Sequence, residues 1–376
     1  MRQLASRLLE WHASGVPYAV ASVVAVRGSA PLQPGAALCV HADGTVVGSV
    51  SGGCVEGAVY ELAREARSSG QPQLASFGYS DDDAFAAGLT CGGEIDVFVQ
   101  AVEGETARVL AAGHRAVEAE RPAVVARVMT GADGQIGRTI VLLEDRHLGT
   151  TGQPGLDEAV LADARMMLGL DDTRVGVYGT GGSTEPRETR VLLESWSPSP
   201  RLLVFGANDH AAAVAEIGAF LGYRVTVCDA RPTFTTPERF PSAHEVVVDW
   251  PHRYLAAAET DRRTVVCVMT HDPKFDVPLL VEALRRPFAY VGALGSRRTQ
   301  AARVRDLREA GVSPAALARL RSPVGLDLGA STPQETAVSI AAELIAVRHG
   351  RSGRALSAID GPIRSERHPS DAAPVR

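Results

Sequence analysis

The chain has 376 residues, of which 45% are hydrophobic and 22% are charged, and its 38 basic and 44 acidic side chains give a formal net charge of -6. This composition is typical of a soluble globular protein and excludes wholesale disorder. Because the chain has no long basic run, its composition argues against a duplex nucleic-acid binder, and at roughly 100 to 200 residues per domain its length predicts two or three domains.

The N-terminal segment places Leu4, Leu8 and Trp11 at helical spacing, without the apolar region and cleavage site of a signal peptide. The longest nearly apolar stretch begins at Tyr18 and is much shorter than the roughly 20 residues that cross a bilayer, so it predicts a buried strand. Five cysteines, an odd number, suit a reducing compartment. We therefore expect a cytoplasmic protein with no membrane or nucleic-acid partner.

One sequence pattern occurs twice. Residues 1–103 and 104–196 each predict a strand, a hairpin, a glycine turn, a helix and further strands. At a constant offset Gly48 matches Gly149, and Glu56 matches Asp157. We predict that the second segment is a degenerate copy of the first, the alternative being chance similarity of Gly- and Ala-rich sequence. If the duplication is real, only the first copy keeps the chemical site, because Gly155 replaces Cys54.

The pattern changes after a Pro- and Ser-rich linker at 195–200. Short β-branched segments such as RLLVFGA and RVTVCDA then alternate with helical segments. This alternation predicts a doubly wound parallel sheet over 201–350, and a final helix capped by Ser331 or Thr332. The remaining segment, 351–376, has few large apolar residues, and we expect it to be disordered. The predicted fold class is therefore α/β, a duplicated α+β region followed by a Rossmann-like sheet.

The first candidate site is the segment GSVSGGCVEG. Cys54 follows Gly52 and Gly53 and directly precedes an expected helix over 55–67. Backbone N–H groups at a helix N-terminus favour a thiolate, and glycines with positive φ let a ligand approach the backbone. Cys91 lies beside paired glycines in LTCGGEID, which suggests that the two loops form one site.

Glu56 and Glu94 are candidate acid-base or hydrogen-bonding partners of these cysteines. The alternative is that Cys54 and Cys91 are small apolar core residues, the commonest role of a cysteine outside a disulfide. Zinc is disfavoured, because there is no CxxC pair and His41 is the only nearby histidine. The remaining cysteines alternate with apolar residues in strands and are expected in the core: Cys39, Cys228 and Cys267.

The second candidate site is the turn after RLLVFGA. A dinucleotide fingerprint, G-x-G-x-x-G, would begin at Gly206, but Asn208 and Ala211 replace its other two glycines. Asp229 follows about 20 residues later, where a ribose-binding carboxylate would lie. Because Asn208 crowds the backbone and Asp209 would repel a pyrophosphate, the sequence favours the fold over NAD(P) binding.

The third candidate site combines two loops that follow strands. MTHDPKFD contains His271, Asp272, Lys274 and Asp276, and GALGSRRT contains glycines, a serine and two arginines before a helix. In open α/β sheets this edge binds ligands, and such a helix start is a plausible phosphate cradle. The alternative is a helix cap with solvated arginines.

Five blocks in this order resemble the xanthine dehydrogenase accessory factors, the XdhC/CoxI family: GSVSGGCVEGAV, LTCGGEIDVFV, MTHDPKFD, YVGALGSRRT and SPVGLDLGASTPQETAVSIAAE. The resemblance extends from about Leu4 to Gly350. It implies an N-terminal domain with a cysteine and a C-terminal Rossmann-like domain. Cys54 occupies the family's GGC(V/L)E position, whereas Asn208 and Asp209 depart from its usual GAGH motif.

The resemblance also implies a function. Members of this family are understood to bind molybdenum cofactor, to protect it during terminal sulfuration and to transfer it to hydroxylases of the xanthine dehydrogenase type. A cysteine desulfurase is the implied sulfur donor, and a homodimer is a further expectation.

We therefore predict a maturation factor, a cofactor chaperone rather than a catalyst, with Cys54 and Cys91 acting on molybdenum or relaying sulfur. The competing hypothesis is an NAD(P)-dependent oxidoreductase with His271 or Asp272 as its acid-base group, and a third is an interaction scaffold without a ligand. The predicted cofactor-binding residues are Cys54, Gly52, Gly53, Glu56, Cys91, Gly92, Gly93, His271, Asp272, Gly295, Ser296, Arg297 and Arg298.

Overall fold

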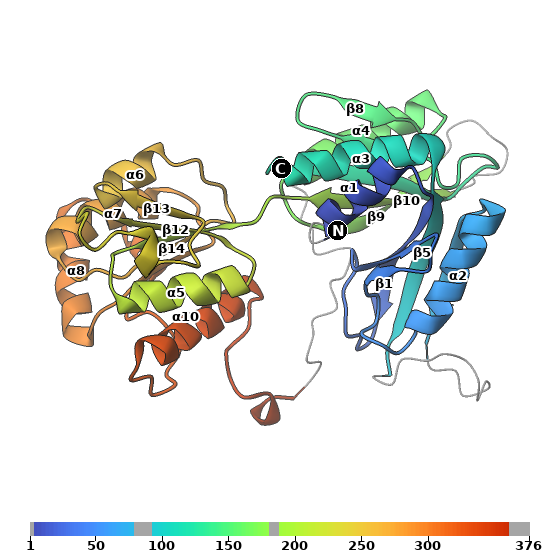
Figure 1. Ribbon diagram of the computed structural model, residues 1–376. Helices are drawn as coiled ribbons and strands as arrows, with labels where there is room; N and C mark the ends of the chain where they lie inside the picture. Colours follow the sequence, from blue (N-terminus) through green and yellow to red (C-terminus); the bar gives the residue numbers. More distant parts are fainter. Residues whose placement is uncertain (1–3, 79–91, 180–187, 361–376) are drawn as a thin grey trace. The chain divides into compact units, whose positions relative to one another are not determined.

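The computed structural model describes residues 4–78, 92–179 and 188–360, and these form two compact units (Figure 1). Of the described residues, the first unit comprises those up to Pro198 together with Asp360, and the second comprises Ser199–Ile359. Of the C-terminal tail, residues 351–360 are described and contain a short 3-10 helix, Leu356–Ala358, whereas the rest of the predicted tail lies outside the described residues. Among the described helices, none is both long and apolar enough to span a membrane.

The first unit begins with helix α1 (Ala5–Ser14) and a five-stranded antiparallel sheet of order β3-β2-β1-β5-β4. Alternate residues of β1 point to opposite faces, as in any strand. Ala19, Ala21 and Val23 pack under helix α2 (Glu56–Ser69), which lies beside β1 and β5 (Figure 1). The strands are β1 (Tyr18–Arg27), β2 (Ala37–His41), β3 (Val46–Gly48), β4 (Gln73–Phe77) and β5 (Glu94–Val102).

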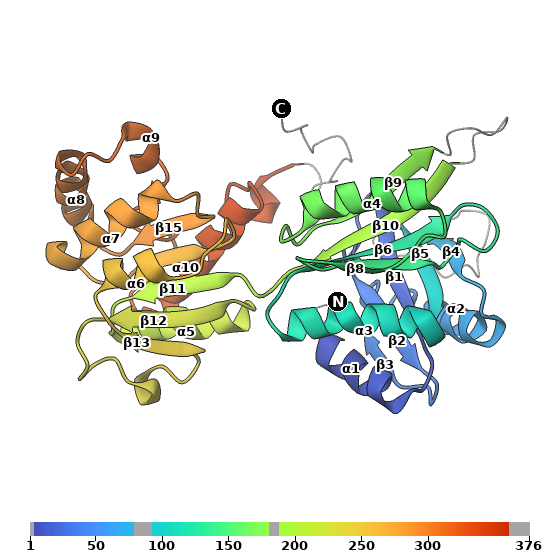
Figure 2. The same ribbon diagram turned by 90° about the horizontal axis from the view of Figure 1, so that it is seen from above.

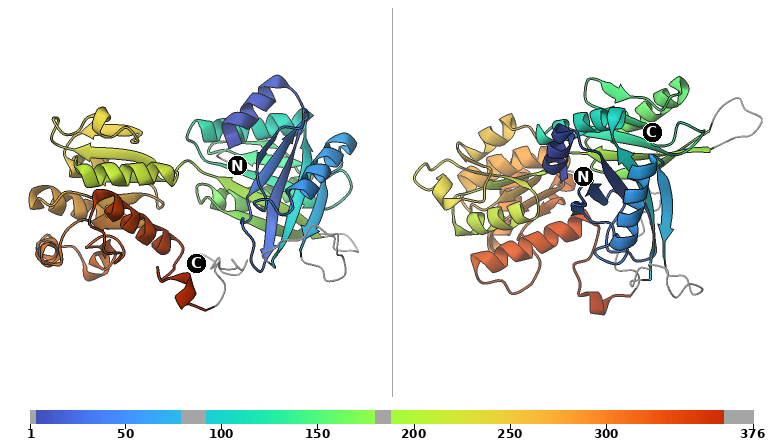
Figure 3. Two further views of the ribbon diagram at one scale, coloured as in Figure 1. Left: turned by 60° about the horizontal axis from the view of Figure 1, so that its bottom comes forward. Right: turned by 45° about the vertical axis from the view of Figure 1, so that its right-hand side comes forward.

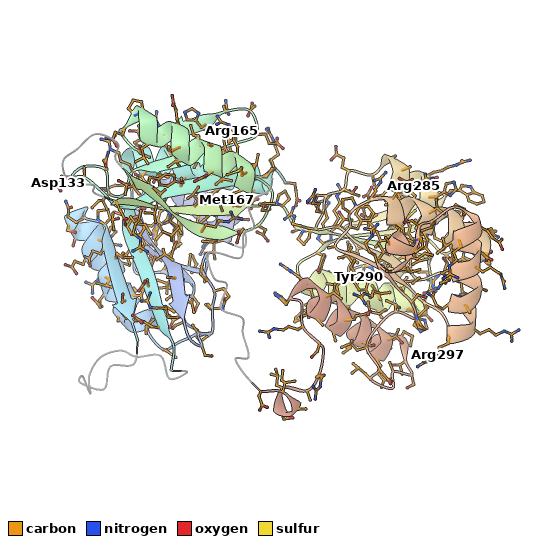
Figure 4. All side chains as sticks on the ribbon, turned by 180° about the vertical axis from the view of Figure 1, so that it is seen from behind. Asp133, Arg165, Met167, Arg285, Tyr290 and Arg297 are labelled. Carbon is orange, nitrogen blue, oxygen red and sulfur yellow. The ribbon has the colours of Figure 1, made fainter. Side chains whose placement is uncertain are left out.

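The second half of this unit repeats the same arrangement, with helix α3 (Gly104–Glu118) before a sheet of order β8-β7-β6-β10-β9. Helix α4 (Pro154–Met167) covers one face of this sheet and α3 lies on the other (Figure 2), and Figure 4 labels Arg165 and Met167 on α4. The strands are β6 (Ala123–Thr130), β7 (Thr139–Leu142), β8 (His147–Gly149), β9 (Thr173–Gly179) and β10 (Glu188–Trp196).

Equivalent glycines end β3 and β8 in the same conformation. Gly48 has φ of 82° and Gly149 has φ of 81°. A Cβ atom would lie 2.1 Å from the Ala37 carbonyl oxygen at Gly48 and 2.0 Å from that of Thr139 at Gly149. Only glycine therefore fits at either position. The common strand order and these two glycines support the proposal that the two halves are copies of one ancestral unit.

The two sheets share a core. Helices α1 and α3 pack together, and Trp11, Tyr18 and Trp196 join this core. It also contains a buried ion pair between Arg127 and Glu194 at 2.6 Å, and Arg127 donates a hydrogen bond to Ser22 of the first sheet. The halves thus form a single unit, held by apolar packing and by one charged cluster.

The second unit contains a six-stranded parallel sheet of order β13-β12-β11-β14-β15-β16, which confirms the predicted α/β class and doubly wound sheet. Helices α5 and α10, which lie side by side (Figure 3), cover one face, while α6, α7, α8 and α9 cover the other. The strands are β11 (Arg201–Phe205), β12 (Arg224–Asp229), β13 (Glu245–Val248), β14 (Val265–Val268), β15 (Tyr290–Ala293) and β16 (Leu320–Arg321).

The last helix of this unit begins where the sequence predicts a cap. Of the two candidate cap residues, Ser331 and Thr332, it is Thr332 that caps α10, and it forms a capping box with Glu335. Cys228 and Cys267 are buried in the core of this unit, and Cys39 is buried in the first unit, which confirms their predicted positions. The helices are α5 (Asp209–Phe220), α6 (Pro251–Ala257), α7 (Pro273–Arg285), α8 (Arg297–Glu309), α9 (Pro314–Leu317) and α10 (Pro333–Arg348), with a 3-10 helix at Pro237–Arg239.

Candidate functional site

The glycine turn between β3 and α2 presents Cys54. Gly52 and Gly53 have φ of 77° and 124°, and nothing lies within 4 Å of a Cβ placed on Gly53. The backbone before Cys54 is therefore open to an approaching group. Cys54 itself is half-buried against the core of the first sheet and lies just before Val55, the N-cap residue of α2. The turn thus holds a partly exposed thiol at a helix N-terminus.

The carboxylate of Glu56 holds this turn together. It accepts hydrogen bonds from the backbone N–H groups of Ser51, Gly52 and Gly53, at 2.9, 2.9 and 2.7 Å. The hydroxyl groups of Ser49 and Ser51 also donate to it. Partial burial raises the pKa of Glu56, but the hydrogen bonds outweigh this effect and lower the pKa to about 2. The carboxylate is therefore ionised at neutral pH and acts as an anchor of the turn rather than as a proton donor.

The second glycine pair contacts the same loop as the first. A Cβ atom on Gly93 would lie 2.2 Å from the carbonyl oxygen of Ser29, in the loop after β1. Pro31 of this loop lies 3.8 Å from a Cβ placed on Gly52. The loop 28–31 is thus a common neighbour of Gly93 and the Cys54 turn. Cys91 lies outside the described residues, so its predicted partnership with Cys54 stays a prediction.

Glu94 is engaged by Arg27, a residue that the sequence did not single out. Arg27 donates to both oxygens of Glu94, at 2.9 and 2.7 Å, and it also pairs with Asp96 at 2.8 Å. These hydrogen bonds from Arg27 lower the pKa of Glu94. The cluster joins the end of β1 to the start of β5, beside Gly92 and Gly93. Glu94 is therefore an ion-pair partner of Arg27 in this structure.

The second half of the unit repeats the turn but not its thiol. Asp157 accepts hydrogen bonds from the Thr151 backbone at 2.7 Å and from the Thr150 hydroxyl at 2.6 Å, as Glu56 does in the first half. Gly155 stands where the first half has Cys54. The carboxylate anchor is thus common to both halves, whereas a cysteine at this turn occurs only in the first.

In the second unit, the turn after β11 is closed by its own side chains. The Asn208 amide donates to the carbonyl oxygen of Met269 at 2.9 Å, while its side-chain oxygen accepts from the Ala211 N–H. Asp229, which is 2% exposed, accepts from the Ala207 N–H at 2.9 Å and pairs with Arg231 at 2.8 Å. Asn208 and Asp229, the side chains that would face a dinucleotide, are therefore hydrogen-bonded to other groups of the protein. For this reason the Rossmann-like fold by itself does not support NAD(P) binding.

The loops after β14 and β15 lie next to each other, because these two strands are paired and Leu294 donates a backbone hydrogen bond to Val268. Asp272 caps α7 and pairs with Lys274 at 3.1 Å, and His271 is exposed. Ser296 caps α8 by accepting from the Thr299 N–H at 3.1 Å. Both loops therefore lie at the carboxyl edge of the sheet, where the sequence places them, and their role in binding a ligand stays a prediction.

Arg297 and Arg298 are the first two residues of α8, and both side chains are exposed; Figure 4 labels Arg297. Neither side chain forms a hydrogen bond or ion pair with another described residue. Two guanidinium groups at the positive end of a helix can attract a phosphate. Among the described residues, no group of three His, Cys, Asp or Glu side chains is arranged to hold a metal ion.

Sequence reasoning missed three kinds of residue at these sites. Ser49 and Ser51 donate hydroxyl groups to Glu56, and their spacing before a Gly-Gly pair is a signal that could have been recognised. Arg27 acts through contacts between strands far apart in sequence, which no local pattern shows. Arg303, buried beneath the loop of Ser296, lies in a strongly polar helix whose composition predicts exposure.

Comparisons with known proteins match both parts of the chain. Residues 11–78 match the model of the XdhC and CoxI family, and residues 202–344 match that of the XdhC Rossmann domain. A Bacillus subtilis protein, named as a probable subunit of xanthine dehydrogenase, is 26% identical over 88% of this chain and 92% of its own length. The Escherichia coli molybdenum cofactor insertion chaperone PaoD is 27% identical over 89% of this chain and 85% of its own length.

A solved structure matches the whole fold. A Bacillus halodurans protein described as a xanthine dehydrogenase superposes with a TM-score of 0.70 and 26% identity, over 93% of this chain and 96% of that one. The similarity therefore covers both units.

Proposed function

The chain belongs to the XdhC and CoxI family, and from this premise we propose that it is a maturation factor that binds molybdenum cofactor. It delivers this cargo, with terminal sulfuration, to a molybdenum hydroxylase of the xanthine dehydrogenase type. One relative that covers most of the chain is named as a molybdenum cofactor insertion chaperone, and another as part of a xanthine dehydrogenase. These names support the maturation role and the class of partner.

The observation that carries this proposal is the Cys54 turn. Its glycines leave the approach to the backbone open, and the ionised Glu56 fixes the turn from the protein side. The cargo's molybdenum is thiophilic, so a partly exposed sulfur on a preorganised turn suits it. Cys54 either ligates the molybdenum or relays sulfur to it. Cys91, Gly92 and Gly93 complete the proposed site.

Glu56 has a supporting role in this proposal. The sequence left it as an acid-base or hydrogen-bonding partner, and its low pKa and its bonds to the turn favour the second role. Because Glu56 satisfies the N–H groups of Ser51, Gly52 and Gly53, these groups are not the binding site for the cargo's anionic parts. We therefore do not assign the cargo's phosphate to this turn.

The start of α8 in the second unit is a separate candidate anion site. Gly295, Ser296, Arg297 and Arg298 form the cradle that we propose for the phosphate of the cofactor, with His271 and Asp272 on the neighbouring loop. The two arginines are exposed and face no carboxylate among the described residues. The positive end of the helix dipole and the two guanidinium groups would both attract a negatively charged phosphate.

We further propose a cysteine desulfurase as the sulfur donor, a homodimer as the working form, and the cytoplasm as the compartment. The persulfide of the desulfurase would supply the sulfur, and the reduced cofactor would supply the two electrons that convert it to a terminal sulfide. The oxidoreductase hypothesis loses its main support, since Asn208 and Asp229 occupy the dinucleotide turn with internal hydrogen bonds.

The test is equilibrium binding of reduced molybdenum cofactor under anaerobic conditions, with NADH as the control ligand. We compare the wild-type chain with Cys54→Ser and with Gly155→Ala, which changes the equivalent position of the second copy. The proposal expects binding that Cys54→Ser weakens and Gly155→Ala leaves intact. Saturable NADH binding without cofactor binding would overturn it in favour of an oxidoreductase.

A further inference from the structure

A buried ion pair lies beneath the carboxyl edge of the parallel sheet in the second unit. Arg303 of α8 and Asp276 of α7 are joined at 2.8 Å, and their side chains are 3% and 4% exposed. Buried charges are costly to desolvate, and a pair without further hydrogen bonds seldom offsets that cost. The other hydrogen bonds of Arg303 and Asp276 therefore show which parts of the fold this ion pair stabilises.

Those bonds reach three loops, each of which follows a different strand. Arg303 donates to the carbonyl oxygen of Leu294 at 2.9 Å, directly before the cradle at Gly295. It also donates to the hydroxyl of Ser322, after β16, at 2.9 Å. The other oxygen of Asp276 accepts from the hydroxyl of Thr270, after β14. One ion pair thus ties together the loops that end β14, β15 and β16.

The fit of Gly295 against this pair is close. Gly295 has φ of 149°, and a Cβ atom there would lie 3.5 Å from Nη1 of Arg303 and 3.2 Å from Thr299. Thr299 also donates its N–H to Ser296, so the cradle, the first turn of α8 and Arg303 pack as one block. Arg303 therefore contacts this backbone directly through its hydrogen bond to the Leu294 carbonyl oxygen, next to Gly295.

We propose that Arg303, held by Asp276, is a positioning residue that sets the conformation of the 295–298 cradle for a phosphate group of the cargo. This inference rests on the proposed function of the cradle. Arg303 itself is buried and does not touch the ligand. It acts by fixing the Leu294 carbonyl and the neighbouring loops, so that the N–H groups and the two exposed arginines of α8 are preorganised.

The conservative variant Arg303→Lys keeps the charge but loses the planar fork that reaches three partners. Its matched control is Arg127→Lys, which changes the buried ion pair of the first unit. Backbone hydrogen exchange is measured first. The proposal expects faster exchange in Arg303→Lys at 270–272, 294–296 and 322–324, with α5 and the first unit unchanged, whereas Arg127→Lys leaves these three loops as in wild type. Unchanged exchange in the loops, or faster exchange throughout the second unit, overturns it.

The second measurement is the affinity for reduced molybdenum cofactor in four proteins: wild type, Arg303→Lys, Arg297→Ala/Arg298→Ala, and the triple variant. Arg303→Lys should weaken binding about tenfold, the usual effect of losing a supporting residue. The triple variant should bind no more weakly than the double variant, because Arg303 acts through the cradle. Additive losses, or a wild-type affinity in Arg303→Lys, contradict the positioning role.

The same four proteins separate this inference from the proposed function. If the double variant binds the cofactor like wild type, the phosphate cradle is refuted, and the positioning role fails with it. If wild type binds no cofactor at all, the maturation proposal fails, whereas the exchange data still show whether Arg303 fixes the loops.

Discussion

The carboxylate of Glu56 accepts a 2.7 Å hydrogen bond from the backbone N–H of Gly53, the residue directly before Cys54. The helix that follows the turn thus supplies, from its own first residue, the group that fixes the turn. The positive φ of Gly52 and Gly53 turns their backbone N–H groups towards Glu56, and the Glu56 carboxylate accepts hydrogen bonds from these groups. The side chain and the turn therefore stabilise each other. The position of Cys54 is a consequence of this arrangement.

Replacing Glu56 by Gln should destabilise the protein and weaken cofactor binding together. The amide presents only one acceptor oxygen and no charge to the turn, and after allowance for solvent screening we expect a loss of about 1 kcal/mol in the free energy of unfolding. Urea denaturation and cofactor titration measure the two effects. In Asp157→Asn, the matched change in the second copy, stability should fall while cofactor affinity stays at the wild-type value. Equal losses of affinity in both variants would contradict the account.

The Glu56 anchor should also make stability depend on acid. Its folded pKa, about 2, lies below the ordinary value of 4.5, so its contribution is fully present above pH 4.5 and is lost as pH falls from there towards 2. Denaturation of wild type and Glu56→Gln at a series of pH values tests this. The difference in stability between the two proteins should shrink as pH falls through this window, and a constant difference would show that the charge of Glu56 is irrelevant.

The buried histidine pair of the first unit predicts a second acid response. His114 is fully buried and stacked on Trp196, and burial followed by the charge of His12 lowers its pKa to about 3. Burial likewise lowers the pKa of His12 to about 4. A histidine whose pKa is lower in the folded than in the unfolded protein does not affect the free energy of unfolding above the unfolded-state pKa of 6.5. As pH falls below 6.5, protonation of the unfolded chain lowers that free energy.

His114→Phe, which preserves the stacking on Trp196, should therefore reduce the loss of stability between pH 6.5 and 4. Thermal denaturation across this range measures the effect. The control is His147→Gln, at an exposed histidine of the same unit. A pH profile for His114→Phe that parallels wild type would refute the assignment.

Gly93 should tolerate no side chain. Its Cβ would lie 2.2 Å from the Ser29 carbonyl oxygen, so Gly93→Ala must displace backbone and should cost about 2 kcal/mol in the free energy of unfolding. Gly57→Ala is the comparison, because Gly57 lies in helix α2 with open space around it and alanine should be neutral or stabilising there. Equal stability of the two variants would mean that the contact between Gly93 and the loop 28–31 does not form.

The thiols should differ sharply in reactivity. Burial raises the pKa of Cys39, Cys228 and Cys267 to about 12, so these three should resist alkylation in the native protein. Cys54 is half-buried and should react first. Iodoacetamide labelling of a Cys91→Ser background, read by peptide mass spectrometry, tests this. Labelling of a core cysteine before Cys54 would contradict the structure of the turn.

Local sequence patterns predicted the elements well. The β-branched segments after residue 200 form the parallel sheet, Thr332 caps α10, and Gly52 and Gly53 adopt positive φ before Cys54. Each of these features depends on neighbours within a few residues, where propensity and capping rules apply. The match between Gly48 and Gly149 is also visible in the sequence, whereas the close approach of each glycine to a neighbouring strand is seen only in the structure.

Features that depend on the tertiary structure could not be predicted. The Asp229 position suggested a ribose ligand, but the fold turns this carboxylate towards Ala207 and Arg231. Arg303 occurs in a helix of high polarity. Its side chain is buried because the loops after β14, β15 and β16 come together around it. Likewise, Gly93 and Ser29 are brought together by pairing of β1 with β5. Such contacts join segments far apart in the chain, and sequence periodicity carries no information about them.

The most direct test of the maturation role is transfer of the cargo. The wild-type chain and Cys54→Ser are each incubated anaerobically with molybdenum cofactor, a cysteine desulfurase and cysteine, and then added to a cofactor-free hydroxylase of the xanthine dehydrogenase type. The account predicts that wild type restores hydroxylase activity and that Cys54→Ser restores far less. Equal activation by both proteins would contradict the role of Cys54, and activation that is the same without the chain would contradict the maturation function itself.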